Sequence, residues 1–317
     1  MPYHLQDYLH YITNQTNRYN LDNLKRTKAY QQYYSRFPEM KWVLLASLVS
    51  RNAGWNMTDL YHEPLHGLLG EKERLQLFLI YEKANWLIFS DAYPQLLIYQ
   101  LSKKLKRPLF YLLPEWQVSE FMIAEWSHYW MHRDGERLLR SLIINEQHVI
   151  QKPIIENKDY HHSIFKNLPY MLQNSLKTNA VLLPTTKSTI YGQWVRRFTK
   201  VDERILLGKQ LATIIFHPQL YPEIHAFHHT VPHTGSRLDY EIFSFYEKTR
   251  SPNLRSVCPS ISHQHIKRKD WYQDTMIKES WILPEKPFKI RSIGSTFYRK
   301  RRLIQNYERL KQKICQT

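Results

Sequence analysis

Glycine and cysteine are scarce in this chain, and long uncharged apolar runs are missing. Only 8 of the 317 residues are glycine, whereas average usage gives roughly 22. Folds that depend on tight glycine turns are therefore disfavoured. No G-x-G-x-x-G or G-x-x-x-x-G-K-[ST] pattern occurs, and Gly208-Lys209 lacks the upstream glycine of a phosphate loop. The sequence thus argues against a nucleotide site of either kind.

The few cysteines and the broken apolar runs also indicate where the protein resides. Cys258 and Cys315 are too few for a disulfide framework, which fits the reducing cytosol. Residues 1–10 lack the charged start and apolar run of a signal peptide. The most apolar region, 78–101, is interrupted by charged residues, so it predicts a pair of core helices and no membrane span. We expect a cytoplasmic protein without a transmembrane segment.

Apolar residues recur at helical spacing through most of the first 250 residues. One predicted helical face, with spacing i, i+3, i+4 and i+7, consists of Tyr30, Tyr33, Tyr34 and Phe37. The run from Trp42 to Ala46 is apolar on all sides, which predicts a central helix. Gly54 is its expected C-cap. Further helices are expected at 71–90, 94–106, 117–133, 135–152 and 201–216, the second of them starting at Pro94. A short strand is expected at 179–184. The predicted fold class is mainly α, a multi-helix globular bundle with short loops.

The composition changes near residue 250 and becomes very basic at the C-terminus. We expect a helical core domain at 1–250 and, at 251–317, a proline-containing segment with a basic tail that packs on this core or trails from it. Leu303, Tyr307 and Leu310 share one face, which predicts a basic amphipathic C-terminal helix. The start of that helix carries the cation run Arg299, Lys300, Arg301 and Arg302. Such a run opposes the helix dipole, so an external anion would offset its cost. The alternative is a frayed, solvated tail.

Five ordered blocks of sequence resemble one family of bacterial proteins. They fall at 17–30, 49–60, 85–96, 144–147 and 232–240, and include Val49-Ser50-Arg51-Asn52-Ala53-Gly54-Trp55, Asn85-Trp86-Leu87 and Pro232-His233-Thr234-Gly235-Ser236-Arg237. Together they resemble the YppC-like family of Bacillus and related bacteria, a domain of unknown function (2515). The resemblance implies a lineage and a cytoplasmic bacterial setting. It implies no substrate and no catalytic residue.

Polar residues on apolar helix faces are the most informative pattern for chemistry. An unpartnered buried carboxylate costs several kcal/mol or becomes neutral, so each must have a cation, a hydrogen-bonding group or a metal beside it. One interpretation is structural, with Glu82, Glu125 and Glu146 paired to Arg or His inside the bundle. A second is a polar pocket that binds a ligand or performs acid–base chemistry. The candidate pocket residues are Arg51, Asn52, Asp59, Glu82, Asn85, Asp91, Glu125, Asn145, Glu146 and His233.

A metal site is the third interpretation of the same helices. Glu125-x-x-His128 has the spacing found in di-iron bundles, but such sites need a second motif and two further carboxylates. His128 and His132 have the spacing of a zinc pair without the H-E-x-x-H order. Glu125, His128 and His132 are therefore the candidate ligands of this interpretation, and we predict neither a bound metal nor a cofactor.

A short loop before an apolar run offers a candidate anion site. Thr234, Gly235, Ser236 and Arg237 combine hydroxyls, a flexible glycine and a guanidinium near a predicted helix start. Such a loop can hold a phosphate or carboxylate. In the alternative interpretation Ser236 caps the helix and Arg237 makes an internal salt bridge. The sequence leaves both open.

The formal net charge of +17 leads to three functional hypotheses. Such an excess favours phosphate-bearing partners, so the first is binding of nucleic acid or a phosphorylated ligand through a basic surface. The second is an enzyme with the buried carboxylate, amide and histidine pocket, of unknown substrate. The third is an interaction scaffold. The sequence decides neither whether the chain is an enzyme nor its oligomeric state.

Overall fold

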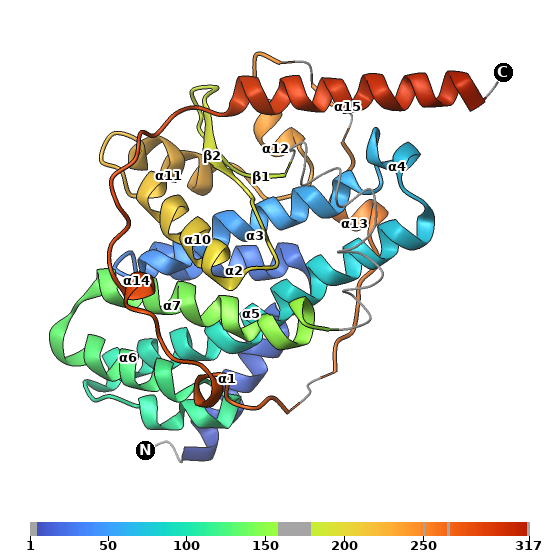
Figure 1. Cartoon of the computed structure of the whole chain (residues 1–317). Helices are drawn as coiled ribbons and strands as arrows, with labels where there is room; N and C mark the ends of the chain where they lie inside the picture. Colours follow the sequence, from blue (N-terminus) through green and yellow to red (C-terminus); the bar gives the residue numbers. More distant parts are fainter. Residues whose placement is uncertain (1–4, 158–178, 247, 250, 265–266, 316–317) are drawn as a thin grey trace.

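The computed structural model describes residues 5–157, 179–246, 248–249, 251–264 and 267–315, and they form a mainly α-helical structure, as predicted. The longer helices are α1 (Leu5–Tyr19), α2 (Asn23–Arg36), α3 (Lys41–Asp59), α5 (Glu71–Leu105), α6 (Glu120–His132), α7 (Gly135–Val149), α10 (Val201–Ile215), α11 (Tyr221–Thr230) and α15 (Gly294–Cys315). The shorter elements are α4 (Leu65–Leu68), α12 (Leu238–Glu241), α13 (Leu254–Val257), α14 (Glu279–Ile282), the 3-10 turns η1 (Phe110–Trp116) and η4 (Tyr272–Asp274), and the π-helical turn η2 (Gln151–Ile155). Figure 1 shows their arrangement.

Several helices begin where a short polar side chain can accept a backbone hydrogen. Asp22 accepts from the Lys25 amide at 2.7 Å and starts α2. Asp134 accepts from the Arg137 amide at 2.9 Å and separates α6 from α7. Each cap satisfies a backbone donor that has no partner within its helix. The break between the helices predicted at 117–133 and 135–152 is therefore confirmed.

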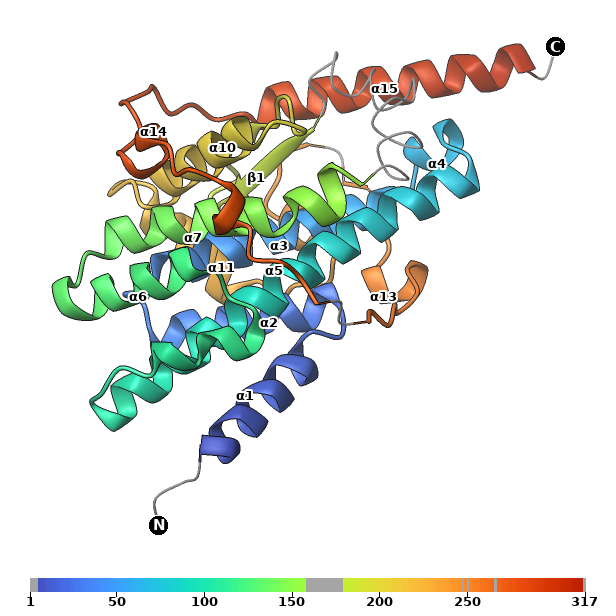
Figure 2. The same ribbon diagram turned by 60° about the horizontal axis from the view of Figure 1, so that its bottom comes forward.

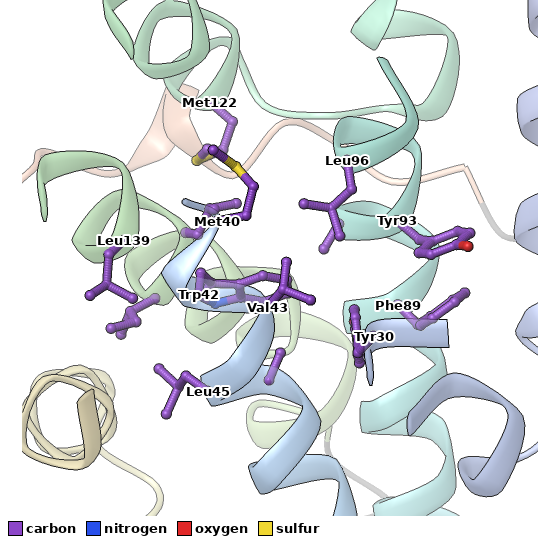
Figure 3. Packing of buried hydrophobic residues seen from close by; sticks show 14 of the residues in the cluster. Tyr30, Met40, Trp42, Val43, Leu45, Phe89, Tyr93, Leu96, Met122 and Leu139 are labelled. Atoms are coloured by element: carbon purple, nitrogen blue, oxygen red, sulfur yellow. The ribbon is translucent and has the colours of Figure 1, made fainter. Parts of the chain in front are cut away.

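Helix α3 runs through the centre of the molecule, as the apolar run at Trp42 predicts. Trp42, Val43 and Leu45 are almost fully buried. Figure 3 shows them between Tyr30 of α2, Phe89 of α5 and residues of α6 and α7. The rings of Tyr30 and Trp42 meet edge to face, with centroids 5.7 Å apart. Because α3 touches neighbours on nearly every side, polar groups on it must find partners inside the protein.

Two expected helix boundaries are wrong. The sequence predicts a new helix starting at Pro94, but α5 continues through it from Glu71 to Leu105. Proline in a helix interior costs about 3 kcal/mol, and burial of this part of α5 among its neighbours outweighs that cost. The sequence also predicts that Gly54 ends α3, yet this glycine lies inside the helix. A methyl group there would lie 2.5 Å from the Asn23 side chain, so this glycine permits close packing.

The strand expected at 179–184 is confirmed as β1 (Ala180–Pro184). It pairs antiparallel with β2 (Ile190–Trp194), whose register places Leu182 opposite Gly192. Gly192 has φ 140°, and a Cβ there would meet the Val181 carbonyl. The sequence pattern missed β2 because this glycine interrupts its run of larger side chains.

The chain beyond residue 250 returns along the helices. Trp271 and Trp281 are buried in the main apolar cluster. Helix α15 then lies along one edge of the molecule, beside α4, in both Figure 1 and Figure 2. Whether 1–250 and 251–317 are separate units stays a prediction. Among the described residues, no helix combines the length and apolarity needed to cross a bilayer.

Candidate functional site

Asp91 of α5 lies at the centre of a buried hydrogen-bond network. Its Oδ2 accepts from Nε2 of Gln95 at 2.7 Å and from Nδ2 of Asn145 at 2.6 Å. A guanidinium nitrogen of Arg268 lies 3.6 Å from its other oxygen. Burial raises the pKa of Asp91 to about 6, although Arg268 and the two amides act in the opposite direction. Both protonation states of this carboxyl are therefore accessible near neutral pH.

Further hydrogen bonds hold the side-chain amides of Asn145 and Gln95 in place. Oδ1 of Asn145 accepts from the Ser119 hydroxyl at 3.1 Å and from the Trp271 indole at 2.9 Å. Oε1 of Gln95 accepts from the Trp126 indole at 2.7 Å. These bonds tie α5, α6 and α7 to the segment after residue 250.

Arg268 connects this network to the surface. It lines a hollow of about 220 Å³ together with Gln117, Glu120 and Asp270. The Arg268 amide donates to Gln117 at 2.6 Å, and Asp270 accepts from the Glu120 amide at 2.8 Å. We call Asp91, Gln95, Asn145 and Arg268 the Asp91 cluster.

Glu146, next to Asn145 on α7, is a second buried carboxyl. It accepts from the Trp42 indole at 3.1 Å and from the Gln147 amide at 2.9 Å. No cation pairs with it within the described residues, and burial raises its pKa to about 7. The hydroxyl of Tyr30 is buried without a hydrogen-bond partner among the described residues. Burial raises the pKa of Tyr30, and Glu146 and Asp91 raise it further, so both carboxyls act electrostatically on this hydroxyl.

Glu82 forms an internal ion pair with Arg26. Its two oxygens lie 2.6 and 2.5 Å from one guanidinium nitrogen of Arg26, and His263 lies 3.7 Å away. Burial alone would raise the pKa of Glu82, but Arg26 and His263 lower it. Asn85 donates to the Tyr81 carbonyl of its own helix at 2.7 Å. The two residues therefore make structural contacts.

Glu125 likewise pairs with a cation. Nη2 and Nε of Arg137 each lie 2.8 Å from its oxygens, and the Ser141 hydroxyl donates at 2.9 Å. The rings of His128 and His132 lie 4.4 Å apart. Within the part of the chain that the structure describes, no group of three or more His, Cys, Asp or Glu side chains could hold a metal.

Arg51 and Asn52 of α3 hold backbone segments in place. Asn52 donates to the Leu182 carbonyl and accepts from the Leu182 amide, both at 2.7 Å, which fastens β1 to α3. Arg51 donates to the carbonyls of His228 and Val231. Its guanidinium is fully buried, and burial lowers its pKa to about 10.

His233 lies between two buried polar side chains. Its Nδ1 is 3.2 Å from Oδ2 of Asp239, and its Nε2 is 2.8 Å from Oδ1 of Asn23. Asp239 also accepts from the Trp55 indole at 3.0 Å and from the Thr234 hydroxyl at 2.5 Å. These donors keep the pKa of Asp239 low despite its burial.

The loop expected to hold an anion is instead satisfied within the protein. Arg237 is buried and forms a two-pronged ion pair with Asp59. Arg301 of α15 lies 3.4 Å from the same carboxylate. Burial alone would raise the pKa of Asp59, and the two cations lower it. The Ser236 hydroxyl donates to the Ser251 carbonyl at 2.7 Å. The internal salt bridge, the alternative left open by the sequence, is thus the observed state of Arg237.

The four cationic side chains at the start of α15 point in different directions. Arg299 and Arg302 are exposed. Lys300 lies over the Trp194 ring, 4.0 Å from its centroid, and Arg301 faces Asp59. Leu303 is 63% exposed. We call the outer side of this helix, formed by Arg299, Arg302, Leu303, Tyr307, Arg309 and Leu310, the α15 face.

The ten pocket candidates therefore divide into separate groups of contacts. Asp91 and Asn145 are joined by a hydrogen bond. Glu82, Glu125 and Asp59 each pair with a different arginine. A buried carboxylate gains most from a cation close to it, so each acid is satisfied locally and they do not gather in one cavity. A catalytic role for any of them stays a prediction.

Sequence comparison places these features in a family. A family described as "Protein of unknown function (DUF2515)" matches residues 18–291. The chain belongs to the DUF2515 family. It is 46% identical over 293 residues to the uncharacterized protein YppC of Bacillus subtilis strain 168, and the alignment covers 92% of each chain. No solved structure matches it. The family resemblance found in the sequence is therefore confirmed.

Sequence reasoning did not identify several residues that pair with the buried acids and amides of this DUF2515 protein. Arg26, Arg137, Arg268 and Trp271 supply the partners of Glu82, Glu125, Asp91 and Asn145. Their signal is indirect, because a buried acid on an apolar helix face requires a cation but does not say which one. The α15 face lies beyond the family match, which ends at residue 291.

Proposed function

We propose that this protein binds a phosphate-bearing partner electrostatically through the α15 face. The observation that supports this is the separation of charge on α15. The helix contains seven Lys or Arg residues and a single acid, Glu308. Arg299, Arg302 and Arg309 are exposed, whereas Glu308 is buried. The outward surface of the helix is therefore cationic.

The exposed arginines of α15 are available to an outside anion. Arg299, Arg302 and Arg309 form no ion pair with any other described residue. Guanidinium groups bind phosphate oxygens through two parallel hydrogen bonds, so an arginine row suits a phosphate array. Arg237, by contrast, is buried with Asp59 and is not part of the proposed surface.

Retention on phosphocellulose tests this proposal directly. We expect the protein to elute at high salt, because binding that releases counterions weakens steeply with salt. The variant Arg299→Gln/Arg302→Gln/Arg309→Gln should elute at clearly lower salt. The matched control Lys72→Gln/Lys104→Gln/Arg107→Gln removes the same charge from exposed positions outside α15. If the two triple variants elute at the same salt concentration, retention depends on the net charge of the protein and not on the α15 face, and the proposal is overturned.

A second function is supported by the Asp91 cluster. A carboxyl with a pKa of about 6, joined through Arg268 to a surface hollow, is suited to acid–base chemistry on a small anionic ligand. Small carboxylates and phosphates should raise the melting temperature of the protein. Arg268→Gln should abolish this shift and Arg107→Gln should retain it. If every carboxylate and phosphate tested shifts the melting temperatures of the two variants equally, this function is contradicted.

A further inference from the structure

Three large apolar side chains form an exposed row on α15. Leu303, Tyr307 and Leu310 follow at i, i+4 and i+7 and are 63%, 60% and 59% exposed. This spacing places them on one side of the helix. A contiguous apolar row in water is a common sign of an interaction site.

A row of cations runs along the same helix beside the apolar row. Arg302 and Arg309 are exposed and lie two turns apart, and Arg299 lies one turn before Leu303. Glu308, the one acid of the helix, turns inward. Its carboxylate lies so close to Gly67 of α4 that a Cβ on that glycine would be 2.4 Å from Oε1. The exposed side of α15 thus combines apolar and positively charged groups without an exposed acid among its described side chains.

We propose that the α15 face docks on the surface of an anionic phospholipid bilayer, with the helix axis parallel to the membrane. This inference rests on the proposed phosphate binding and names the partner. Basic amphipathic helices lie at the boundary between headgroups and acyl chains, where apolar residues enter the boundary and cations meet lipid phosphates. The long Arg302 and Arg309 side chains can reach headgroups while their methylene groups stay near the apolar layer.

The position of α15 in the fold permits this contact. Both Figure 1 and Figure 2 show the helix along one edge of the molecule, with its C-terminal end extending past α4. The opposite side of α15 is held by Arg301 on Asp59 and by the stacking of Tyr298 on Tyr246 at 4.3 Å. The face is therefore presented by an anchored helix.

Charge and side-chain type favour a bilayer over two other partners. Single-stranded nucleic acid is held by cations together with aromatic rings that stack on bases, and Leu303 and Leu310 have no ring. A second copy packed on the same face would bring two arginine rows together, and like charges across an interface are unfavourable. An anionic bilayer complements both the cations and the apolar row.

Co-sedimentation of the full chain with lipid vesicles tests the inference. We expect binding to vesicles of phosphatidylcholine mixed with phosphatidylglycerol, and little binding to phosphatidylcholine alone. Leu303→Gln/Tyr307→Gln/Leu310→Gln should weaken binding to the anionic vesicles by at least about tenfold, because it removes three apolar contacts. The control Tyr111→Gln/Met131→Gln removes exposed apolar side chains of η1 and α6, outside α15, and should bind as the natural chain does.

The phosphocellulose assay separates failure of this inference from failure of the proposed function. If the apolar triple variant binds vesicles like the natural chain, the lipid assignment is overturned while phosphate binding stands. If the arginine triple variant loses neither vesicle binding nor phosphocellulose retention, both are overturned. The natural chain could fail to bind anionic vesicles and form a dimer by light scattering that the apolar triple variant abolishes. The apolar row would then contact a second copy of the chain, and the lipid assignment would be overturned. If a DNA duplex binds and anionic vesicles do not, the partner is nucleic acid.

Discussion

Arg301 and Arg302 are adjacent in sequence but have opposite environments. Arg301 faces inward to the carboxylate of Asp59, which Arg237 also holds. Arg302 is exposed on the α15 face. Successive residues of an α-helix differ by about 100° in direction, so a run of four cations cannot form one surface. Part of the basic run completes the interior, and the rest remains for an outside partner.

The comparison extends to the two regions as a whole. In the interior, the acids Asp59, Glu82 and Glu125 each have an arginine within the protein. On the α15 face, the exposed arginines form no ion pair with an acid among the described residues. Removing an interior charge should therefore destabilise the fold strongly, whereas removing an exterior charge should affect binding far more than stability.

The largest effect is expected from breaking the ion pair between Arg237 and Asp59. Arg237→Met leaves the buried Asp59 carboxylate with one of its two arginines, Arg301, and removing one partner of a buried pair costs about 3–5 kcal/mol. Urea unfolding followed by circular dichroism measures this loss. Asp59→Leu/Arg237→Met should recover part of the stability, because no uncompensated charge remains. A loss below about 1 kcal/mol for Arg237→Met would remove the distinction between the two regions.

Glu146 sharpens the comparison, because it is an interior acid without a cation. Its pKa is about 7 in the folded protein against an ordinary value of 4.5. Between these two pH values the folded state holds a proton that the unfolded state has released. Glu146 should therefore contribute a fall in the free energy of unfolding as pH rises through this window, by up to about 3 kcal/mol. Buried His228 acts in the opposite direction up to about pH 6.5, because burial lowers its pKa to about 3 and the unfolded state holds the extra proton.

Glu146→Gln should remove the contribution of Glu146, which is measured as the difference between the urea midpoints of the variant and the natural chain from pH 4.5 to 7. The contributions of Asp91, whose pKa is raised, and of His228, whose pKa is lowered, are common to both proteins and cancel in this difference. An unchanged slope in Glu146→Gln would show that this carboxyl is not held in its neutral form.

The sequence predicts this fold better than it predicts the sites. Helical periodicity identifies α3 as central and places Glu82, Glu125 and Asn145 on inward faces, because it needs only local spacing. It does not find the partners, since Arg26 and Glu82 lie 56 residues apart. Pro94 misleads because propensity is local, whereas the packing that carries α5 through it is tertiary. Ser236 and Arg237 fit an anion site and an internal cap equally well until Asp59 is seen beside them.

Gly54 tests how tightly the interior polar groups are packed. Alanine is favoured over glycine by about 1 kcal/mol in a helix, but here its Cβ would lie 2.5 Å from Asn23 Oδ1 and 2.8 Å from His233 Nε2. Both side chains are held by hydrogen bonds. Gly54→Ala should therefore destabilise the protein by about 1–3 kcal/mol in urea unfolding. Gly135→Ala is the matched control, because its nearest neighbour would be 4.0 Å away. A stabilised Gly54→Ala would show that Asn23 and His233 can move aside.

The smallest effect on stability is expected on the α15 face. Arg299→Gln/Arg302→Gln/Arg309→Gln removes three exposed charges, and surface substitutions of this kind stay within about 0.5 kcal/mol each. Adding Arg301→Gln should lower the urea midpoint further, because Asp59 then loses its second cation. The same triple variant is predicted to elute from phosphocellulose at clearly lower salt than the natural chain. A triple variant that unfolds as readily as Arg237→Met would place these arginines among the structural charges, and the α15 face would then have no cations to offer a partner.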